Sequence, residues 1–371
     1  MIKRLFAGYD RFCDQRLEVA RFQPEAVWEI LPEDKTEEGK SFEGRPLYQI
    51  ERGEGKTKVL LWTQMHGNEP TATFAVLDVL KFLDTEETDS KYIRTTILEN
   101  LHLRFLPIIN PDGLARFQRR TAQGIDMNRD FERADCPESQ FLKAQAEGFQ
   151  PDWGFNLHDQ NRYYAVGDSS EATVLAFLAP PSDRAISISG TRREAMQLLG
   201  KLMTDLQTLL PNKIARYSDE FERRAFGDNF QRLDIRTVLF EGGFLPDDPE
   251  KQKLRKYYFV ALVAALYKIA TKSFIKTEIS VYQEIPENKS RFFDVLCRDL
   301  TISSDGKTYQ TDLAFNRLEN NNFQLMEMGD LRAFCGHQTY EGLELSEMSS
   351  LLVVEGKGSL RFEGNAVRWD T

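Results

Sequence analysis

Two hydrophobic patterns alternate along the chain up to about residue 275. Short apolar runs, such as residues 59–62 and 237–240, are typical of strands that are buried on both faces of a sheet. Residues 191–210 place apolar side chains at helical spacing, and residues 72–83 are apolar on nearly every side of a helix. Strands that alternate with helices predict an α/β fold, with a mixed, mostly parallel sheet and helices on both faces.

The expected elements follow one another closely. Short helical pieces are predicted at residues 7–22 and from Pro24 onward, before a pair of strands at residues 47–51 and 59–62. Further strands are expected at residues 101–110, 151–158 and 237–241, and further helices at residues 72–83, 138–147, 191–210 and 249–269. The sequence Pro111-Asp-Gly113 predicts a turn at the end of the strand at residues 101–110.

The pattern changes beyond residue 275. Short alternating or apolar runs occur at residues 278–282, 292–296, 299–302, 308–315 and 351–354, with turn sequences at residues 304–306 and 355–358. Few segments there have helical spacing. We therefore expect two domains, a larger α/β domain at residues 1–275 and a small β-rich C-terminal domain at residues 276–371.

Polar side chains stand where the predicted central strands end. His66, Asn110, His158 and Glu241 each lie at the carboxyl end of one strand or just beyond it. Ligands of open α/β sheets bind beyond this edge. Chance could place one or two polar groups there, but four such groups favour a binding or catalytic site.

Two of these residues suggest a metal. His66 and Glu69 form a His-x-x-Glu pair at a turn between a strand and a helix, and His158 follows at another strand end. Two imidazoles, one carboxylate and an open position for water are typical of catalytic zinc sites. A lone His-x-x-Glu pair is more often a surface or capping pair, so the interpretation depends on the third ligand.

Composition narrows the classes of function. The formal net charge is −10 and the pI is about 5.2, and no basic stripe offsets the acidic total, so we expect no nucleic-acid partner. The longest uncharged apolar run, residues 257–267, is too short to cross a bilayer, so no membrane partner is expected. The four cysteines lie far apart, which suits a reduced compartment and predicts a cytoplasmic protein.

Several motifs together resemble a known family, the zinc carboxypeptidases of the carboxypeptidase A type. The resemblance covers about residues 40–270 and keeps the order of the family's motifs. The motifs are His66-Gly-Asn-Glu69, Asn110-Pro-Asp-Gly113, Gly124-Ile-Asp-Met-Asn-Arg-Asp-Phe131, Leu157-His158 and Phe240-Glu241. Each motif alone would be weak, but the ordered set is specific.

The resemblance implies a metallopeptidase with one zinc ion per chain, bound by His66, Glu69 and His158. Glu241 matches the family's catalytic glutamate. Arg119 matches the arginine that polarises the scissile carbonyl and steadies the oxyanion.

The resemblance also implies a grip on the substrate. Asn128 and Arg129 match the pair that binds the terminal carboxylate of a peptide, and Asp126 matches the carboxylate that orients a zinc-binding histidine. We therefore expect a substrate with a free carboxylate, either a peptide or an acyl amino acid.

Two positions depart from the family's pattern. Spacing places Phe221 where the family has a mobile tyrosine over the site, so the role of that hydroxyl is in doubt. Asp228 lies near the position that sets side-chain preference, where an acid would favour a basic or diaminopimelate-like terminal residue.

Two alternatives stay open. Enzymes of the same superfamily that resemble aspartoacylase and succinylglutamate desuccinylase cleave acylated amino acids and carry a β-rich C-terminal domain. The β-rich segment and Phe221 lean toward them, whereas Asn110-Pro-Asp-Gly113 and the spacing of Arg119 lean toward peptidases. A silent scaffold that kept the fold is the other alternative, and it need not retain zinc.

Overall fold

The computed structural model consists of two compact units. It describes residues 1–13, 18–19, 22–86, 88–304, 307–318, 323–341, 352–354, 358–363 and 366–370. The first unit comprises Met1–Asn161 and Thr173–Asn288, and the second comprises Arg162–Ala172 and Lys289–Thr371. The change of pattern in the sequence placed a boundary at residue 275. The contacts place it later, because helix α10 (Ile279–Gln283) packs on helix α7 (Gly190–Leu206) of the first unit.

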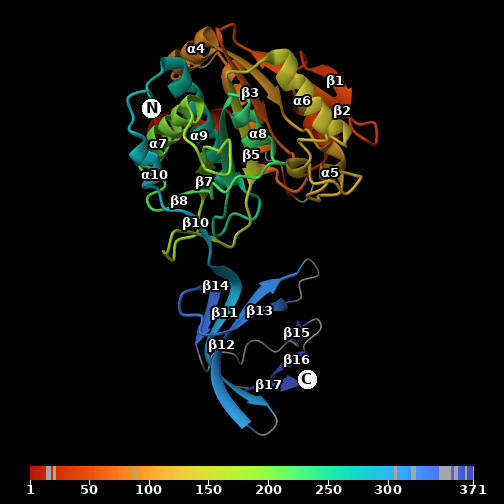
Figure 1. Ribbon diagram of the computed structural model, residues 1–371, viewed down its shortest axis with the longest axis vertical. Coiled ribbons are helices and arrows are strands. Elements are labelled where there is room, and N and C mark those ends of the chain that lie inside the picture. The colour runs from red at the N-terminus through yellow and green to blue at the C-terminus, as the bar shows by residue number, and fades with distance from the viewer. Residues whose placement is uncertain are drawn as a thin grey trace. The chain divides into compact units, whose positions relative to one another are not determined.

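An eight-stranded mixed sheet forms the centre of the first unit (Figure 1). Its strand order is β1-β2-β4-β3-β5-β9-β7-β8. The strands are β1 (Thr36–Lys40), β2 (Pro46–Arg52), β3 (Thr57–Trp62), β4 (Leu101–Leu106), β5 (Trp153–Asp159), β7 (Leu175–Leu178), β8 (Ile214–Arg216) and β9 (Arg236–Gly242). The adjacent strands β4, β3, β5 and β9 are all parallel, which confirms the predicted mostly parallel sheet.

The predicted pairing of residues 47–51 with residues 59–62 is wrong. Strand β4 lies between β2 and β3, and it pairs antiparallel with β2 and parallel with β3. Strand β3 is apolar and buried from Val59 to Trp62, as expected of a central strand, and it pairs with β4 on one edge and β5 on the other.

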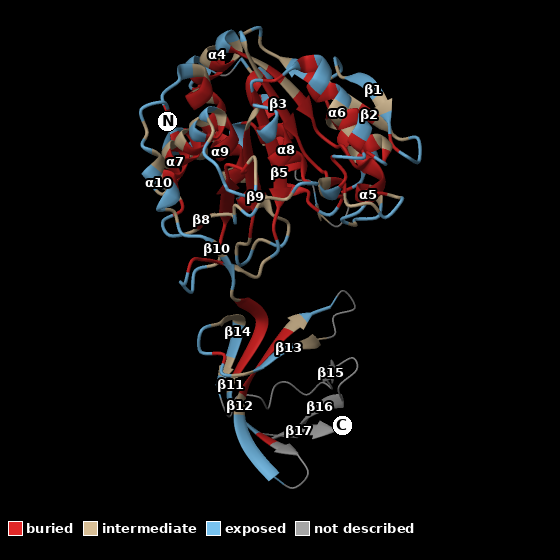
Figure 2. Ribbon diagram, viewed as in Figure 1, coloured by how far each residue is buried: buried red, intermediate tan, exposed pale blue. Residues whose placement is uncertain are grey.

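Helices cover both faces of the sheet, as predicted. Val59 and Leu61 of β3 pack into the core that includes helices α3 (Thr71–Asp84) and α9 (Gln252–Thr271). Leu60 and Trp62 pack into a second core with helices α6 (Pro137–Phe149) and α8 (Phe226–Arg232). Successive side chains of a strand point to opposite faces, so an apolar run on β3 serves both cores. Figure 2 shows the buried sheet between the inner surfaces of these helices.

The helices of the first unit span the following residues. They are α1 (Ile2–Gly8), α2 (Pro24–Ile30), α3 (Thr71–Asp84), α4 (Lys91–Asn100), α5 (Pro111–Ala115), α6 (Pro137–Phe149), α7, α8 (Phe226–Arg232), α9 (Gln252–Thr271) and α10, with short 3₁₀ helices η1 (Tyr9–Arg11) and η3 (Met127–Arg129).

Local structure differs from expectation at three places. The helix predicted at residues 7–22 ends with η1, and residues 14–17 and 20–21 lie outside the described part of the chain. The turn predicted at residues 111–113 is the first turn of α5, because Asn110 caps that helix by accepting from Gly113 N at 2.9 Å. The strand predicted at residues 278–282 is helix α10.

The second unit is β-rich, as predicted. Its larger sheet has the order β13-β12-β11-β17-β16-β15, with β14 paired to β11, and a small sheet pairs β10 with β6. The strands are β6 (Tyr164–Val166), β10 (Asn288–Ser290), β11 (Phe292–Ser304), β12 (Lys307–Arg317), β13 (Phe323–Gly329), β14 (Cys335–Glu341), β15 (Leu352–Val354), β16 (Gly358–Glu363) and β17 (Ala366–Asp370).

Strand β11 joins two strands that the sequence separates at residues 292–296 and 299–302. Its register with β12 shifts between Cys297 and Leu300, so a bulge interrupts the alternation without ending the strand. The predicted turns at residues 304–306 and 355–358, and Leu351 of the predicted last strand, fall wholly or partly outside the described residues.

Among the helices that the structure describes, none has the length and apolar character needed to span a membrane.

Candidate metal centre

The carboxyl ends of four neighbouring strands bring the predicted polar residues together. His66 follows β3 and Asn110 follows β4, while His158 and Glu241 stand opposite each other in β5 and β9. All four side chains are buried. The sheet thus gathers residues that are widely separated in the sequence at one edge.

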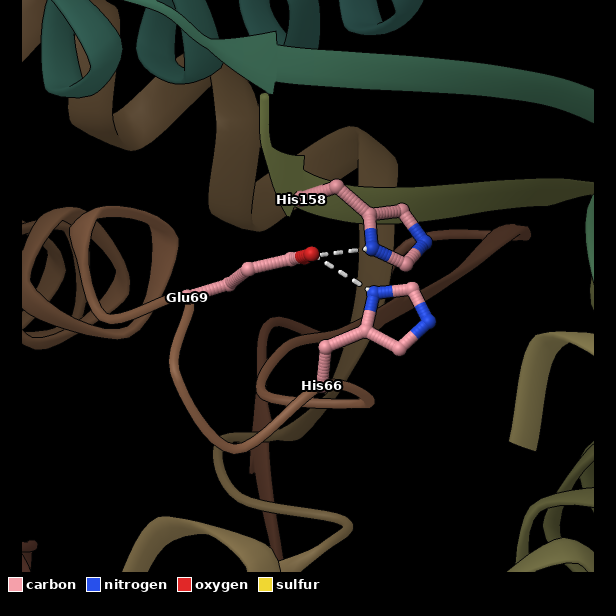
Figure 3. A group of neighbouring side chains, drawn as sticks. All are labelled: His66, Glu69 and His158. Carbon is pink, nitrogen blue, oxygen red and sulfur yellow. Dashed lines mark hydrogen bonds and ion pairs between the residues drawn. The ribbon is translucent and has the colours of Figure 1, made fainter. Parts of the chain in front are cut away.

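The carboxylate of Glu69 points toward both histidines from one side (Figure 3). Its Oε1 is 2.7 Å from His66 Nδ1, and its Oε2 is 2.8 Å from His158 Nδ1. The potential ligand atoms of the three residues all lie within 4.8 Å of one another. Two imidazole nitrogens and one carboxylate that converge in this way fit the donor set of a zinc ion.

A tight turn positions His66. Gln64 has a positive φ of 55°, and Gly67 lies so close to α5 that an added Cβ would be 2.0 Å from Gly113 C. The side chain of Asn110 holds the two segments together, because its Nδ2 donates to Met65 O at 3.1 Å. Glycine is therefore required at position 67 by close backbone approach.

The start of helix α3 is tied to β5 beside the histidines. Asp159 Oδ2 accepts from Thr71 Oγ1 at 2.8 Å and from Lys251 Nζ at 2.6 Å. The backbone N of Asp159 also donates to Glu69 Oε2 at 3.2 Å. The sequence reasoning missed Asp159 and Lys251. Asp159 could have been noticed because it directly follows His158 in the sequence. Nothing in the local sequence around Lys251 indicates its contact with Asp159.

Burial and nearby charges together shift the pKa values of the three candidate ligands. Burial disfavours the charged form of Glu69, but the two imidazoles outweigh it and hold the pKa of Glu69 well below its usual range. Burial also opposes the charged form of His66, yet Glu69 and Asp126 raise its pKa. For His158 burial dominates and lowers the pKa, which favours the neutral imidazole that binds metals.

The pKa of Glu241 shifts in the opposite direction to the pKa of Glu69. Burial, followed by the nearby charges of Glu69 and Asp159, raises the pKa of Glu241 well above its usual value. Its Oε2 is buried without a hydrogen-bond partner among the described residues. A raised pKa makes this carboxyl a stronger proton acceptor than an ordinary glutamate.

Arg119 and Asp126 flank His66. Asp126 Oδ1 is 3.2 Å from His66 Nε2, and Arg119 Nε donates to Asp126 Oδ2 at 3.0 Å. Arg119 Nη1 lies 3.4 Å from Glu69 Oε1. The neighbouring Arg120 donates instead to the carbonyl of Gly124 at 3.0 Å, so Arg119 is the arginine that reaches the candidate ligands.

Asn128 and Arg129 lie in η3, directly after Asp126. Asn128 Oδ1 accepts from Phe226 N at 3.1 Å, and Arg129 Nε is 3.2 Å from Glu222 Oε2. The ion pair of Arg129 with Glu222 had no counterpart in the sequence reasoning.

Phe221 lies in the loop between β8 and α8, and Asp228 lies in α8 directly after that loop. Asp228 is buried in the first turn of α8, where its Oδ1 accepts from Glu222 N at 3.0 Å. Burial raises the pKa of Asp228 to about 7. Phe221 is half-buried in the loop.

Comparison with known proteins finds similarity to carboxypeptidases. The zinc carboxypeptidase family matches residues 34–156, a range that includes His66, Glu69 and Arg119 and ends before His158 and Glu241.

Two curated relatives have carboxypeptidase names. Carboxypeptidase SOL1 of Arabidopsis thaliana is 33% identical over 100 residues, which are 25% of this chain and 20% of that protein. Carboxypeptidase 2 of Trichophyton tonsurans is 27% identical over 175 residues, which are 46% of this chain and 32% of that protein. The chain thus spans a third or less of the length of these relatives.

Solved structures share the fold. A metallo-carboxypeptidase from Burkholderia cenocepacia has a TM-score of 0.53 and 17% identity, with 67% of each chain covered. Thrombin activatable fibrinolysis inhibitor has a TM-score of 0.52 and 16% identity, over 74% of this chain and 80% of that chain.

Proposed function

We propose that this chain, whose residues 34–156 match the zinc carboxypeptidase family, is a zinc-dependent metallocarboxypeptidase that removes C-terminal residues from peptides. The observation that carries this proposal is the convergence of His66, Glu69 and His158 beside Glu241 at one edge of the sheet.

His66, Glu69 and His158 are the residues that would hold the zinc ion. When bound, zinc acts as a Lewis acid that polarises the scissile carbonyl and lowers the pKa of a coordinated water to roughly 7. Asp126 keeps the ring of His66 oriented through Nε2, so that Nδ1 faces Glu69. All three residues are buried, and Glu69 contacts the Nδ1 atoms of both histidines, which favours a preformed ligand set.

Glu241 is the proposed general base and acid. Its carboxylate accepts a proton from the attacking water and later delivers that proton to the leaving amine. The raised pKa supports the first step, because it makes Glu241 a better proton acceptor than an ordinary carboxylate.

Arg119 is proposed to stabilise the oxyanion. Its side chain is 43% exposed while its guanidinium contacts Glu69 and Asp126, so it faces both the solvent and the ligands. A positive charge at this position favours the developing negative charge on the carbonyl oxygen.

Substrate binding is assigned to the next segment of the chain. Arg129 is proposed to bind the terminal carboxylate, with Asn128 as its neighbour, because a planar guanidinium suits a carboxylate. Asp228 and Phe221 are proposed to line the side-chain site of the terminal residue.

A second candidate is hydrolysis of N-acyl amino acids. The β-rich second unit and the phenylalanine at position 221 favour it. Both activities use the same ligands and the same base, so only the substrate separates them.

The test is a paired panel of substrates for the zinc-loaded, full-length protein, with a chelated control. One half contains N-blocked dipeptides with varied terminal residues, including lysine, and the other contains N-acyl amino acids. Chelator-sensitive release from the dipeptides is expected. Cleavage of the acyl amino acids alone would transfer the protein to the deacylases, and zinc binding without any turnover would contradict both proposals.

We also propose a cytoplasmic location. The four cysteines, all within the described residues, form no disulfide bond, which is typical of reducing compartments. Cell fractionation tests this, and recovery of the protein in an oxidising compartment would contradict it.

A further inference from the structure

The loop between β8 and α8, residues 217–225, lies against the segment that carries the proposed carboxylate-binding residues. Phe131 N donates to Arg224 O at 3.1 Å, and Asn128 Oδ1 accepts from Phe226 N. Arg223 forms an ion pair with Glu132 across the same contact. These contacts bring Glu222 of the loop to Arg129.

The carboxylate of Glu222 is held by two guanidinium groups. Its Oε2 is 3.2 Å from Arg129 Nε and 2.7 Å from Arg224 Nη2. Its Oε1 accepts from Arg224 Nε at 2.9 Å and from the backbone N of Arg224 at 3.1 Å. Hydrogen bonds from Arg224 are the main reason that the pKa of Glu222 falls to about 2, so Glu222 is an anion at any physiological pH.

We propose that Glu222 is a specificity-determining residue that occupies Arg129 in the free protein and competes there with the carboxylate of the substrate. The inference rests on the proposed function, because it takes Arg129 as the group that binds the terminal carboxylate. It adds an internal competitor, so the affinity for free carboxylates is set by an exchange of partners and not by Arg129 alone.

The geometry favours exchange over a fixed pair. The side chains of Arg129 and Glu222 are 39% and 30% exposed, and ion pairs near solvent contribute at most about 1 kcal/mol. An anion tethered to the same molecule nevertheless competes at an effective concentration on the order of millimolar. Arg224 contacts both oxygens of Glu222, so the charge of Glu222 stays neutralised when Arg129 turns to the substrate.

The test compares Glu222→Gln with the wild type on two forms of one substrate, N-acetyl-phenylalanyl-lysine and its C-terminal carboxamide. Loss of the competing charge is expected to lower KM for the free acid about fivefold, the factor that corresponds to about 1 kcal/mol, with kcat unchanged. The carboxamide, which has no charge to compete for Arg129, is expected to show no change.

Three further variants fix the cause. Glu132→Gln removes one negative charge from the same surface, next to Arg223, and is expected to leave KM unchanged. Arg224→Gln removes the alternative partner of Glu222 and is expected to raise KM for the free acid. In an Arg129→Ala background, Glu222→Gln is expected to have no effect.

A binding measurement separates this inference from the proposed function. Calorimetry with the full-length, zinc-loaded Glu241→Gln variant gives the affinity for N-acetyl-phenylalanyl-lysine without turnover, with and without Glu222→Gln. About fivefold tighter binding with Glu222→Gln would support the competition even if no hydrolysis occurs. Unchanged or weaker binding would overturn it and assign Glu222 to orienting Arg129 or to no role.

Discussion

At the scale of single residues, Glu241 shows how the surroundings of a carboxyl group shape its chemistry. It is buried near two other carboxylates, Glu69 and Asp159, and these raise its pKa together with burial. Arg119 and Lys251 act in the opposite direction. The net effect is a raised pKa, which suits the proposed role of Glu241 as a proton acceptor.

Replacement of Glu241 by glutamine tests this role. The side chain keeps its size but can no longer accept a proton, so kcat/KM is expected to fall by about 10²- to 10⁴-fold. Zinc content, measured by metal analysis, is expected to stay at the wild-type level because the three proposed ligands are unchanged. Turnover close to that of the wild type would remove Glu241 from the mechanism.

Asp228 links pH to stability. Its folded-state pKa of about 7 lies above the ordinary value of 3.8, so the folded state binds more protons than the unfolded state between these values. Protonated Asp228 therefore contributes to the stability of the folded state. This contribution is fully present below about pH 4 and is lost as the pH rises through 7. Each pKa unit corresponds to about 1.4 kcal/mol.

The variant Asp228→Asn measures this linkage. Asparagine is neutral at every pH and can still accept from Glu222 N, so the variant avoids the cost of ionising a buried acid. Its stability gain over the wild type is expected to grow by about 2 kcal/mol between pH 5.5 and pH 8.5, as measured by denaturant unfolding. A gain that does not depend on pH would contradict the raised pKa.

At the scale of elements, the turn that carries His66 depends on helix α5. Asn110 caps α5 and also binds Met65 O, and Gly67 packs directly on the backbone of Gly113. The geometry of the first histidine is therefore set by a helix that follows the neighbouring strand.

Replacement of Gly67 by alanine tests this dependence. The new Cβ would lie 2.0 Å from Gly113 C, so the turn or α5 must move. We expect lower stability, by about 1–3 kcal/mol, and weaker zinc binding in competition with a chelator. Gly148→Ala is a matched control, because a Cβ there meets nothing within 4 Å. Unchanged zinc affinity in Gly67→Ala would show that the turn adapts without cost.

At the scale of the whole molecule, the proposed zinc ligands connect separate parts of the first unit. His66 and Glu69 lie between β3 and α3, whereas His158 belongs to β5. An unfolded chain cannot hold these groups together, so zinc binds the folded state and stabilises it by mass action.

Removal of zinc is therefore expected to lower the melting temperature. Saturation at about a thousand times the dissociation constant adds about 4 kcal/mol, which corresponds to roughly 7 °C for the first unit. Calorimetric scans before and after chelation, and after zinc is restored, measure the change. A melting temperature that does not respond while the metal content falls would contradict a site built from these three residues.

The sequence by itself determined most of the larger elements and the set of candidate site residues. Strand β3 and helix α3 were predictable because burial on one or both faces leaves a local pattern of apolar side chains. His66, Glu69, His158 and Glu241 were recognisable from their order along the chain and their places at strand ends. The β-rich character of the second unit was also visible as short alternating runs.

The tertiary structure alone decided which segments are neighbours. Strand β4 lies between β2 and β3. No local pattern encodes that position, because several strands of the chain could form hydrogen bonds with the same edge of β3. The pairs Lys251–Asp159 and Arg129–Glu222 join residues from distant segments. Their partners are fixed by how the sheet and its loops pack, since the attraction between two charges depends on distance in space and not on separation along the chain.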